Sequence, residues 1–197
     1  MRIIAGEFKG RIIESPSERT TRPTTDRVRE SIFSSIYSRL PELAGVNVLD
    51  AFAGSGALGI EALSRGAHGC TFIERDRAAR DVLERNLASL FLKAPRVRVV
   101  ATDSFDVAAQ LASHDPFGLV LLDPPYAEGP TRVHELLDEL VDYGKLAHGC
   151  VIVYEHALQS KEAVAEEFAI DGRFVLDGQK KYGKIGVTYL KLHDHED

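Results

Sequence analysis

Short apolar runs separated by amphipathic stretches occupy the chain from residue 46 onward, and this alternation restricts the fold more than any other feature. The runs at residues 46–49, 71–73, 97–101, 119–122 and 151–154 are nearly all apolar, which is typical of strands buried on both faces. Helical periodicity fills the gaps, at residues 60–65, 78–91, 105–112, 132–142 and 161–168. The pattern therefore predicts a doubly wound α/β fold, with a mostly parallel sheet and helices on both of its faces.

Both ends of the chain extend this pattern. Residues 173–176 and 185–192 are two β-like runs interrupted by glycines, so we expect a C-terminal antiparallel hairpin that brings the sheet to seven strands. Residues 26–40 place an apolar side chain at every fourth position behind a Thr-Thr-Asp capping signal, which predicts a helix. We expect one domain over residues 1–197, with residues 1–40 forming a basic extension and a helix packed on it.

For nucleic-acid binding, the distribution of charge along the chain is more informative than the net charge. A formal net charge of -6 suits a nucleic-acid-binding protein poorly, because phosphate contacts require lysine and arginine. Residues 1–29, however, hold seven basic and four acidic side chains, so any basic surface is local.

Several classes of protein are excluded by what the sequence lacks. No apolar run approaches the roughly 20 residues that span a bilayer, and residues 1–10 do not resemble a secretory signal, so we expect a cytoplasmic location. Cys70 and Cys150 lie in apolar runs and are interpreted as core thiols. The histidines show no metal-ligand spacing, so no metal is expected.

A glycine-rich turn follows the first predicted strand. It reads Gly54-Ser55-Gly56-Ala57-Leu58-Gly59, opens a predicted helix, and has Glu74 at the end of the next strand. Glycines there let the backbone turn sharply and approach a ligand, while a carboxylate at the second strand end can accept both ribose hydroxyls. The sequence therefore predicts a site for a nucleoside-containing cofactor rather than a simple tight turn.

The flanks of this turn favour S-adenosylmethionine over a dinucleotide. Asp50 lies four residues before Gly54, where its charge would repel a pyrophosphate but stabilise a sulfonium and an ammonium. Asp103, just after the third strand, is placed to accept a hydrogen bond from an adenine amino group and can also cap a helix. The full predicted cofactor set is Asp50, Phe52, Ala53, Gly54, Ser55, Gly56, Glu74, Arg75, Asp103, Ser104 and Thr25.

The fourth predicted strand ends in Asp123-Pro124-Pro125-Tyr126, at the edge of the sheet where open α/β folds bind ligands. Two successive prolines fix the backbone and remove two donors, so neighbouring carbonyls can face a substrate. An exocyclic amine that donates to the Asp123 carboxylate and the Pro124 carbonyl would direct its lone pair at a methyl group. Tyr126 can stack on the base, which must be flipped out or already unpaired. We expect these four residues to be catalytic.

With these motifs assembled, the chain resembles the RsmD-type family of bacterial 16S ribosomal RNA guanine-N2 methyltransferases. The resemblance rests on residues 22–30, on "DAFAGSGALGIEALSRG" at residues 50–66, on residues 72–76, and on Lys181-Tyr182-Gly183. It implies a Rossmann-like class I methyltransferase fold that modifies guanine in 16S rRNA of an assembling small ribosomal subunit. Some family members have Phe where this chain has Tyr126; both rings stack on a base. A monomer is expected.

Basic residues near the motifs are candidates for phosphate contacts. They are Lys9, Arg11, Arg22, Arg27, Arg29, Lys180, Lys181 and Lys184. The alternative interpretation of a single basic residue of this kind is ordinary solvated surface charge.

Three other functions remain open at this stage. A DNA adenine or cytosine amino-methyltransferase shares the Asp-Pro-Pro-Tyr tetrad, but sequence-specific enzymes of that kind usually carry an added target-recognition region. An NAD-dependent oxidoreductase shares the glycine turn and Glu74 but leaves residues 123–126 unexplained. A non-enzymatic RNA-binding protein would not bind S-adenosylmethionine, so calorimetry separates it from an enzyme.

Overall fold

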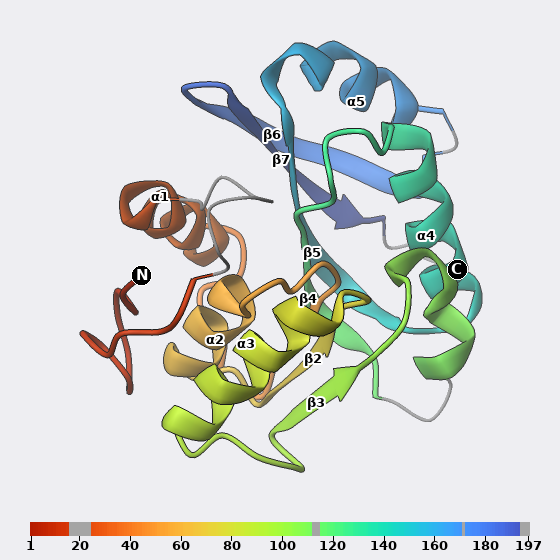
Figure 1. Cartoon of the computed structure of the whole chain (residues 1–197). Coiled ribbons are helices and arrows are strands. Elements are labelled where there is room, and N and C mark those ends of the chain that lie inside the picture. The colour runs from red at the N-terminus through yellow and green to blue at the C-terminus, as the bar shows by residue number, and fades with distance from the viewer. Residues whose placement is uncertain (16–24, 112–114, 171, 194–197) are drawn as a thin grey trace. The chain divides into compact units, whose positions relative to one another are not determined.

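The computed structural model describes residues 1–15, 25–111, 115–170 and 172–193 (Figure 1). The chain divides into two compact units, Met1–Asp103 and Ser104–Asp197. The glycine turn lies in the first unit and the Asp-Pro-Pro-Tyr tetrad in the second. Each unit is therefore described by itself.

The first unit contains a parallel sheet whose strands follow the order β3-β2-β1. Its strands are β1 (Asn47–Asp50), β2 (Gly69–Ile73) and β3 (Val97–Val100), and its helices are α1 (Asp26–Tyr37), α2 (Ala57–Ser64) and α3 (Arg77–Ser89). Helix α2 packs against β1 and β2. Three of the predicted strands and three of the predicted helices are thus confirmed, with ends shifted by a few residues.

Local capping explains where two of these helices begin. The Thr25 hydroxyl accepts a hydrogen bond from the Val28 N–H, which confirms the capping signal before α1. The Asp76 carboxylate accepts one from the Ala79 N–H at the start of α3. Helix α1 ends at Tyr37 instead of Leu40, and the Ser38 hydroxyl bonds the Ser35 carbonyl there.

The second unit holds a mixed sheet in the order β4-β5-β7-β6. Its strands are β4 (Phe117–Leu122), β5 (Leu146–Ala157), β6 (Phe174–Tyr182) and β7 (Ile185–Leu192), and its helices are α4 (Pro130–Asp142) and α5 (Lys161–Glu167), preceded by the short η3 (Leu158–Ser160). Strand β4 pairs with β5 in parallel, and β7 is antiparallel to both β5 and β6. The predicted C-terminal hairpin is therefore confirmed, and the described residues contain seven strands.

One predicted helix is wrong. Residues 105–112 were expected to form an α-helix, but two 3-10 segments occupy this stretch, η1 (Ser104–Asp106) and η2 (Ala108–Leu111). Short connectors between strands commonly adopt 3-10 turns. Both η1 and η2 pack against α4.

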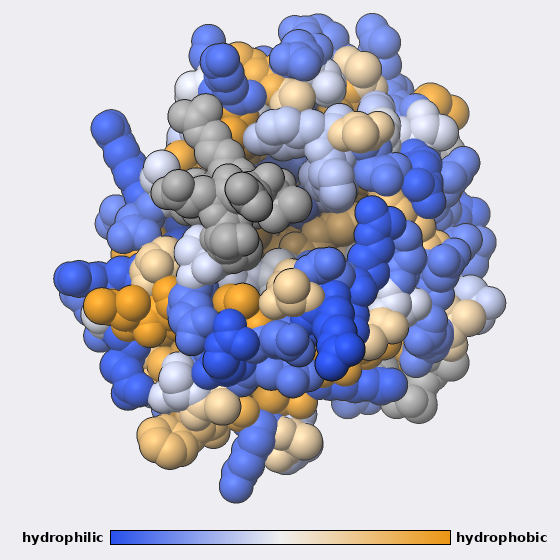
Figure 2. Space-filling view, in the orientation of Figure 1, coloured by the Kyte–Doolittle hydropathy of each residue, from blue (hydrophilic) through white to orange (hydrophobic). Residues whose placement is uncertain are grey.

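Polar residues predominate on the face shown in Figure 2, where apolar residues form separate groups. Among the described residues, no helix has the length and apolar character needed to cross a membrane. Cys70 and Cys150 are both buried thiols outside any disulfide, which confirms their interpretation as core residues.

Candidate functional site

The glycine turn joins β1 to α2 through two residues with left-handed backbone. Gly54 has φ 53° and Gly56 has φ 83°, a conformation that side chains with a Cβ rarely adopt. A Cβ at Gly56 would lie 2.4 Å from a methyl of Leu83, so the turn also needs glycine for packing. A Cβ at Gly54 would meet no atom within 4 Å, so the space beside this residue is open to a ligand.

Glu74 ties this turn to the end of β2. Its Oε2 accepts a hydrogen bond of 2.8 Å from the Gly54 N–H, and its Oε1 accepts one of 2.8 Å from the Asp76 N–H. Each carboxylate oxygen carries two lone pairs, so these bonds leave acceptor capacity for hydroxyl groups. The side chain is half-buried and remains accessible to a ligand.

Asp50 has a structural task that the sequence did not reveal. It is buried, and its Oδ2 accepts a hydrogen bond of 2.9 Å from the Gly59 N–H in the first turn of α2. A carboxylate at a helix N-terminus is favoured by the helix dipole and satisfies an otherwise unpaired N–H. Asp50 therefore positions α2, and its predicted contribution to a cofactor site stays a prediction.

Asp103 forms an ion pair at the end of the first unit. Its Oδ2 lies 2.7 Å from a guanidinium nitrogen of Arg75, and both side chains are partly exposed. The pair orients the Asp103 carboxylate near the strand ends where an adenine was expected. Of the other predicted cofactor residues, Ala53 and Ser55 are buried, Phe52 is half-buried, and Ser104 opens η1 in the second unit.

Asn86 on α3 is a residue that sequence reasoning missed. Its side-chain amide donates to the Ser55 carbonyl at 2.9 Å and to the Glu14 carbonyl at 3.1 Å. Its Oδ1 accepts the Glu14 N–H at 2.7 Å. Asn86 therefore holds the glycine turn and residue 14 of the N-terminal segment together. Nothing in its sequence context marks this role, since it is one polar residue in an amphipathic helix.

In the second unit, Asp123-Pro124-Pro125-Tyr126 follows β4 directly. Asp123 keeps some contact with solvent, but the protein displaces water from around its carboxyl group. This desolvation disfavours the charged form and raises the pKa of Asp123 to about 6. Tyr126 is 57% exposed. The tetrad thus places a carboxylate, backbone carbonyls held by two prolines and an exposed aromatic side chain at the end of β4.

Comparison with known proteins fits these motifs. A family model described as "Conserved hypothetical protein 95" matches residues 1–191. Ribosomal RNA small subunit methyltransferase D of Escherichia coli K12 is 42% identical over 160 residues, which cover 81% of this chain and 76% of the relative. The chain belongs to the RsmD-type methyltransferase family.

Two more members of this set align over nearly their full length. Putative rRNA methyltransferase YlbH of Bacillus subtilis is 38% identical over 192 residues, covering 97% of this chain and 98% of the relative. The structure of the putative methyltransferase yhhF from Escherichia coli matches with a TM-score of 0.80 at 36% identity, over 98% of this chain and 97% of that one. These likenesses confirm the predicted class I methyltransferase fold.

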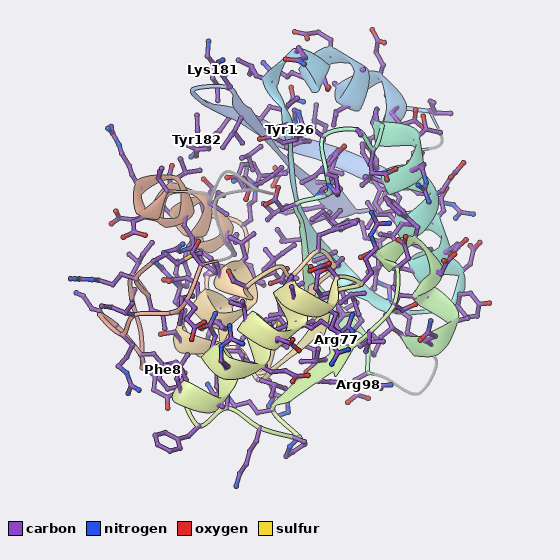
Figure 3. All side chains as sticks on the ribbon, viewed as in Figure 1. Phe8, Arg77, Arg98, Tyr126, Lys181 and Tyr182 are labelled. Carbon is purple, nitrogen blue, oxygen red and sulfur yellow. The ribbon has the colours of Figure 1, made fainter. Side chains whose placement is uncertain are left out.

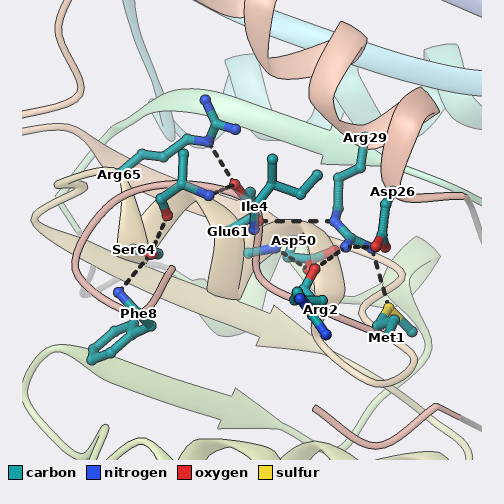
Figure 4. A network of polar contacts seen from close by, with 12 residues as sticks. Met1, Arg2, Ile4, Phe8, Asp26, Arg29, Asp50, Glu61, Ser64 and Arg65 are labelled. Carbon is teal, nitrogen blue, oxygen red and sulfur yellow. Dashed lines mark hydrogen bonds and ion pairs between the residues drawn. The ribbon is translucent and has the colours of Figure 1, made fainter. Parts of the chain in front are cut away.

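A correction concerns Arg29, which the sequence placed among the RNA-binding residues. Its side chain is buried and bonds the Arg2 carbonyl, the Met1 sulfur at 3.2 Å and the Asp26 carboxylate at 2.9 Å (Figure 4). Its Nε lies 3.9 Å from Oε2 of the buried Glu61. Arg29 therefore holds the N-terminal segment against α1 and α2 and presents no charge to RNA.

Glu61 is the centre of this attachment. Its carboxylate accepts the N–H groups of Ile4 at 2.9 Å and Ala5 at 3.1 Å, and it also pairs with Arg65 at 2.7 Å (Figure 4). Next to it, the Ser64 hydroxyl donates to the Ala5 carbonyl and accepts the Phe8 N–H. These hydrogen bonds hold the N-terminal residues against α2.

The remaining basic candidates are exposed. Lys9, Arg11 and Arg27 belong to the first unit, although Arg11 also donates to the Ser89 carbonyl at 2.7 Å. Lys180, Lys181 and Lys184 lie at the tip of the β6–β7 hairpin, where Figure 3 labels Lys181 and Tyr182. Arg22 lies outside the described residues.

Proposed function

We propose that this protein methylates the N2 amine of a guanine in 16S ribosomal RNA, with S-adenosylmethionine as the methyl donor. The observation that carries the proposal is the pair of motifs at strand ends: a glycine turn bonded to Glu74 in the first unit and the Asp-Pro-Pro-Tyr tetrad in the second. The names of the relatives support the choice of RNA, since two of them are described as acting on ribosomal RNA.

The residues of the first unit fit this cofactor. The open space at Gly54 admits a ligand, and the remaining lone pairs of Glu74 suit ribose hydroxyls. Asp103, oriented by Arg75, offers an acceptor for the adenine amine. A class I structure of this fold, SMU.776, is described as a complex with SAH and matches with a TM-score of 0.67 at 15% identity, which supports the fold alone. The bound cofactor supplies an electrophilic methyl group on a sulfonium.

The residues of the second unit supply hydrogen-bond acceptors that can orient the target amine. The N2 amine of guanine is a weak nucleophile because its lone pair is delocalised into the ring. Donation of its two N–H groups to the Asp123 carboxylate and the Pro124 carbonyl favours a pyramidal nitrogen, and most of the gain comes from positioning. As the N–C bond forms and the S–C bond breaks, one amine proton leaves, and the Asp123 carboxylate accepts it. Its pKa of about 6 suits proton transfer near neutral pH.

The test is to map methylated nucleosides in ribosomal RNA from cells with and without the gene. We expect loss of one N2-methylguanine from 16S rRNA in the deletion and its return when the purified protein and S-adenosylmethionine are added to that RNA or its particles. An unchanged 16S rRNA would contradict the proposal. Efficient methylation of duplex DNA would instead favour the amino-methyltransferase alternative, which shares the tetrad.

A further inference from the structure

The glycine turn at residues 54–56 packs against one face of helix α3, within the first unit. Leu83 and Asn86 are three residues apart in α3, so their side chains project from the same face. A methyl of Leu83 fills the space next to Gly56, where a Cβ would lie only 2.4 Å from it. The Asn86 amide donates to the Ser55 carbonyl at 2.9 Å. Helix α3 therefore fixes two successive residues of the turn.

Both polar atoms of the Asn86 side chain are bonded. The amide nitrogen carries two hydrogens, and it donates to the carbonyls of Ser55 and Glu14. The Oδ1 accepts the Glu14 N–H at 2.7 Å. Asn86 is 2% exposed and Ser55 is 4% exposed, so water competes little for these bonds. Any other orientation of the amide would bury polar groups without partners, so this one is strongly favoured.

The neighbouring residue, Arg85, attaches Glu14 in a different way. Its guanidinium lies 2.8 Å from the Glu14 carboxylate, and both side chains are half exposed. Exposed ion pairs of this kind contribute little to stability. Arg85 thus holds the side chain of Glu14, whereas Asn86 holds the main chain of Glu14 and the glycine turn together.

We propose that Asn86 is a positioning residue for cofactor binding, which fixes the Ser55 carbonyl and links the glycine turn to the N-terminal segment at Glu14. The inference rests on the proposed function, because it concerns the site proposed for S-adenosylmethionine. The open space for a ligand lies at Gly54, directly before Ser55, so a shift of the Ser55 carbonyl alters the shape of that space. A ligand that binds one conformation of the turn also stabilises the bonds made in that conformation, so the cofactor should strengthen the attachment of Glu14.

The first experiment measures the affinity for S-adenosylhomocysteine, which has no methyl group to transfer, by titration calorimetry. Asn86→Ala removes three hydrogen bonds, and Asn86→Asp keeps the size but turns a carboxylate toward two carbonyls. Both variants should bind about 5- to 10-fold more weakly, the range expected for one or two lost hydrogen bonds. In methyl transfer they should raise KM for S-adenosylmethionine and leave kcat at saturating cofactor within about twofold, because the tetrad lies in the second unit.

The matched control is Arg85→Gln, which removes the ion pair with Glu14 and keeps the bonds of Asn86. It should bind S-adenosylhomocysteine with the wild-type Kd. Thermal unfolding checks that each variant is folded at the assay temperature. A wild-type Kd in the folded Asn86 variants would overturn the inference. An equal loss of affinity in Arg85→Gln would also contradict it, because the N-terminal attachment in general would then be responsible.

The second experiment uses wild-type protein, so it decides the question even if the Asn86 variants do not fold. Asn47 and Asn86 are the two asparagines of the chain, so isotopic labelling of asparagine gives two side-chain amide signals in NMR spectra. Hydrogen exchange of the Asn86 amide and of the Glu14 N–H should slow about tenfold with S-adenosylhomocysteine at ten times its Kd, since opening of these bonds then competes with binding. Asn47 begins β1, at the end of the strand away from the turn, and its exchange should not change.

Unchanged exchange at Asn86 and Glu14 in protein that binds S-adenosylhomocysteine would overturn the inference. Wild-type protein that does not bind S-adenosylhomocysteine at all would instead defeat the proposed function. The two failures are therefore distinguishable.

Discussion

The Gly54 N–H donates a hydrogen bond of 2.8 Å to Oε2 of Glu74, so the acid at the end of β2 fixes the glycine turn that follows β1. The same carboxylate is the one proposed to accept ribose hydroxyls. Glu74 therefore shapes the turn and contributes to binding, and its replacement affects both.

Replacing Glu74 with Ala should weaken S-adenosylmethionine binding by about 10- to 100-fold, because charge-assisted hydrogen bonds contribute about 1.5–3 kcal/mol each. Titration calorimetry measures the dissociation constant. Glu84→Ala, which removes an exposed acid from α3, is the matched control and should bind normally. An unchanged constant with collapsed turnover would mean that another acid holds the ribose.

Replacing Asp123 with Asn or Ala should abolish methyl transfer and leave cofactor affinity nearly intact. The carboxyl must be ionised to accept the amine N–H, and its pKa is raised from 3.8 to about 6. Wild-type kcat/KM should therefore fall as pH drops through about 6, by tenfold per unit below it. A pH profile of single-turnover rates tests this. Full activity held down to pH 4.5 would remove the ionised carboxylate from the mechanism.

Replacing Arg29 with Ala should lower the free energy of unfolding by about 3–5 kcal/mol, because it leaves the buried Glu61 with fewer partners. Urea denaturation followed by circular dichroism gives the value. Arg27→Ala, two residues earlier in α1 and exposed, should change stability by less than about 0.5 kcal/mol. Equal stabilities for the two variants would argue against the anchoring role of Arg29.

Reversing the charges of Arg22 and Arg27 together should weaken RNA binding and reduce its salt dependence. Each lost phosphate contact lowers the log-log slope by roughly 0.7 to 0.9. Filter binding of 16S rRNA over a range of salt concentrations provides the slopes, and calorimetry should show cofactor affinity little changed. A slope identical to that of wild-type protein would place the RNA contacts elsewhere, for instance on the hairpin lysines.

Methylation should proceed faster on assembled small-subunit particles than on naked 16S rRNA. The acidic charge outside residues 1–29 repels bare RNA, whereas basic ribosomal proteins on a particle can meet it. Radiolabelled methyl transfer to both substrates, taken from the gene-deleted strain, makes the comparison. Equal rates would refute the particle preference while leaving the RNA target in place.

The sequence by itself determined the strands, most helices and both motifs. Gly54 and Gly56 mark a turn because backbone conformation is a local property, and Asp123-Pro124-Pro125 marks a rigid strand exit for the same reason. Capping of α1 by Thr25 was likewise predictable, because its partner Val28 is only three residues away. Periodicity also located the hairpin that β6 and β7 form.

Tertiary structure alone decided which charged side chains are buried. Arg29 and Arg27 look equivalent in the sequence, but only Arg29 is buried, next to Glu61 of a different helix. The hydrogen bond from the Gly59 N–H to Asp50 likewise joins two residues nine positions apart, and the sequence did not reveal it. The reason is that burial and charge pairing depend on residues distant in the chain, whose approach no local pattern encodes.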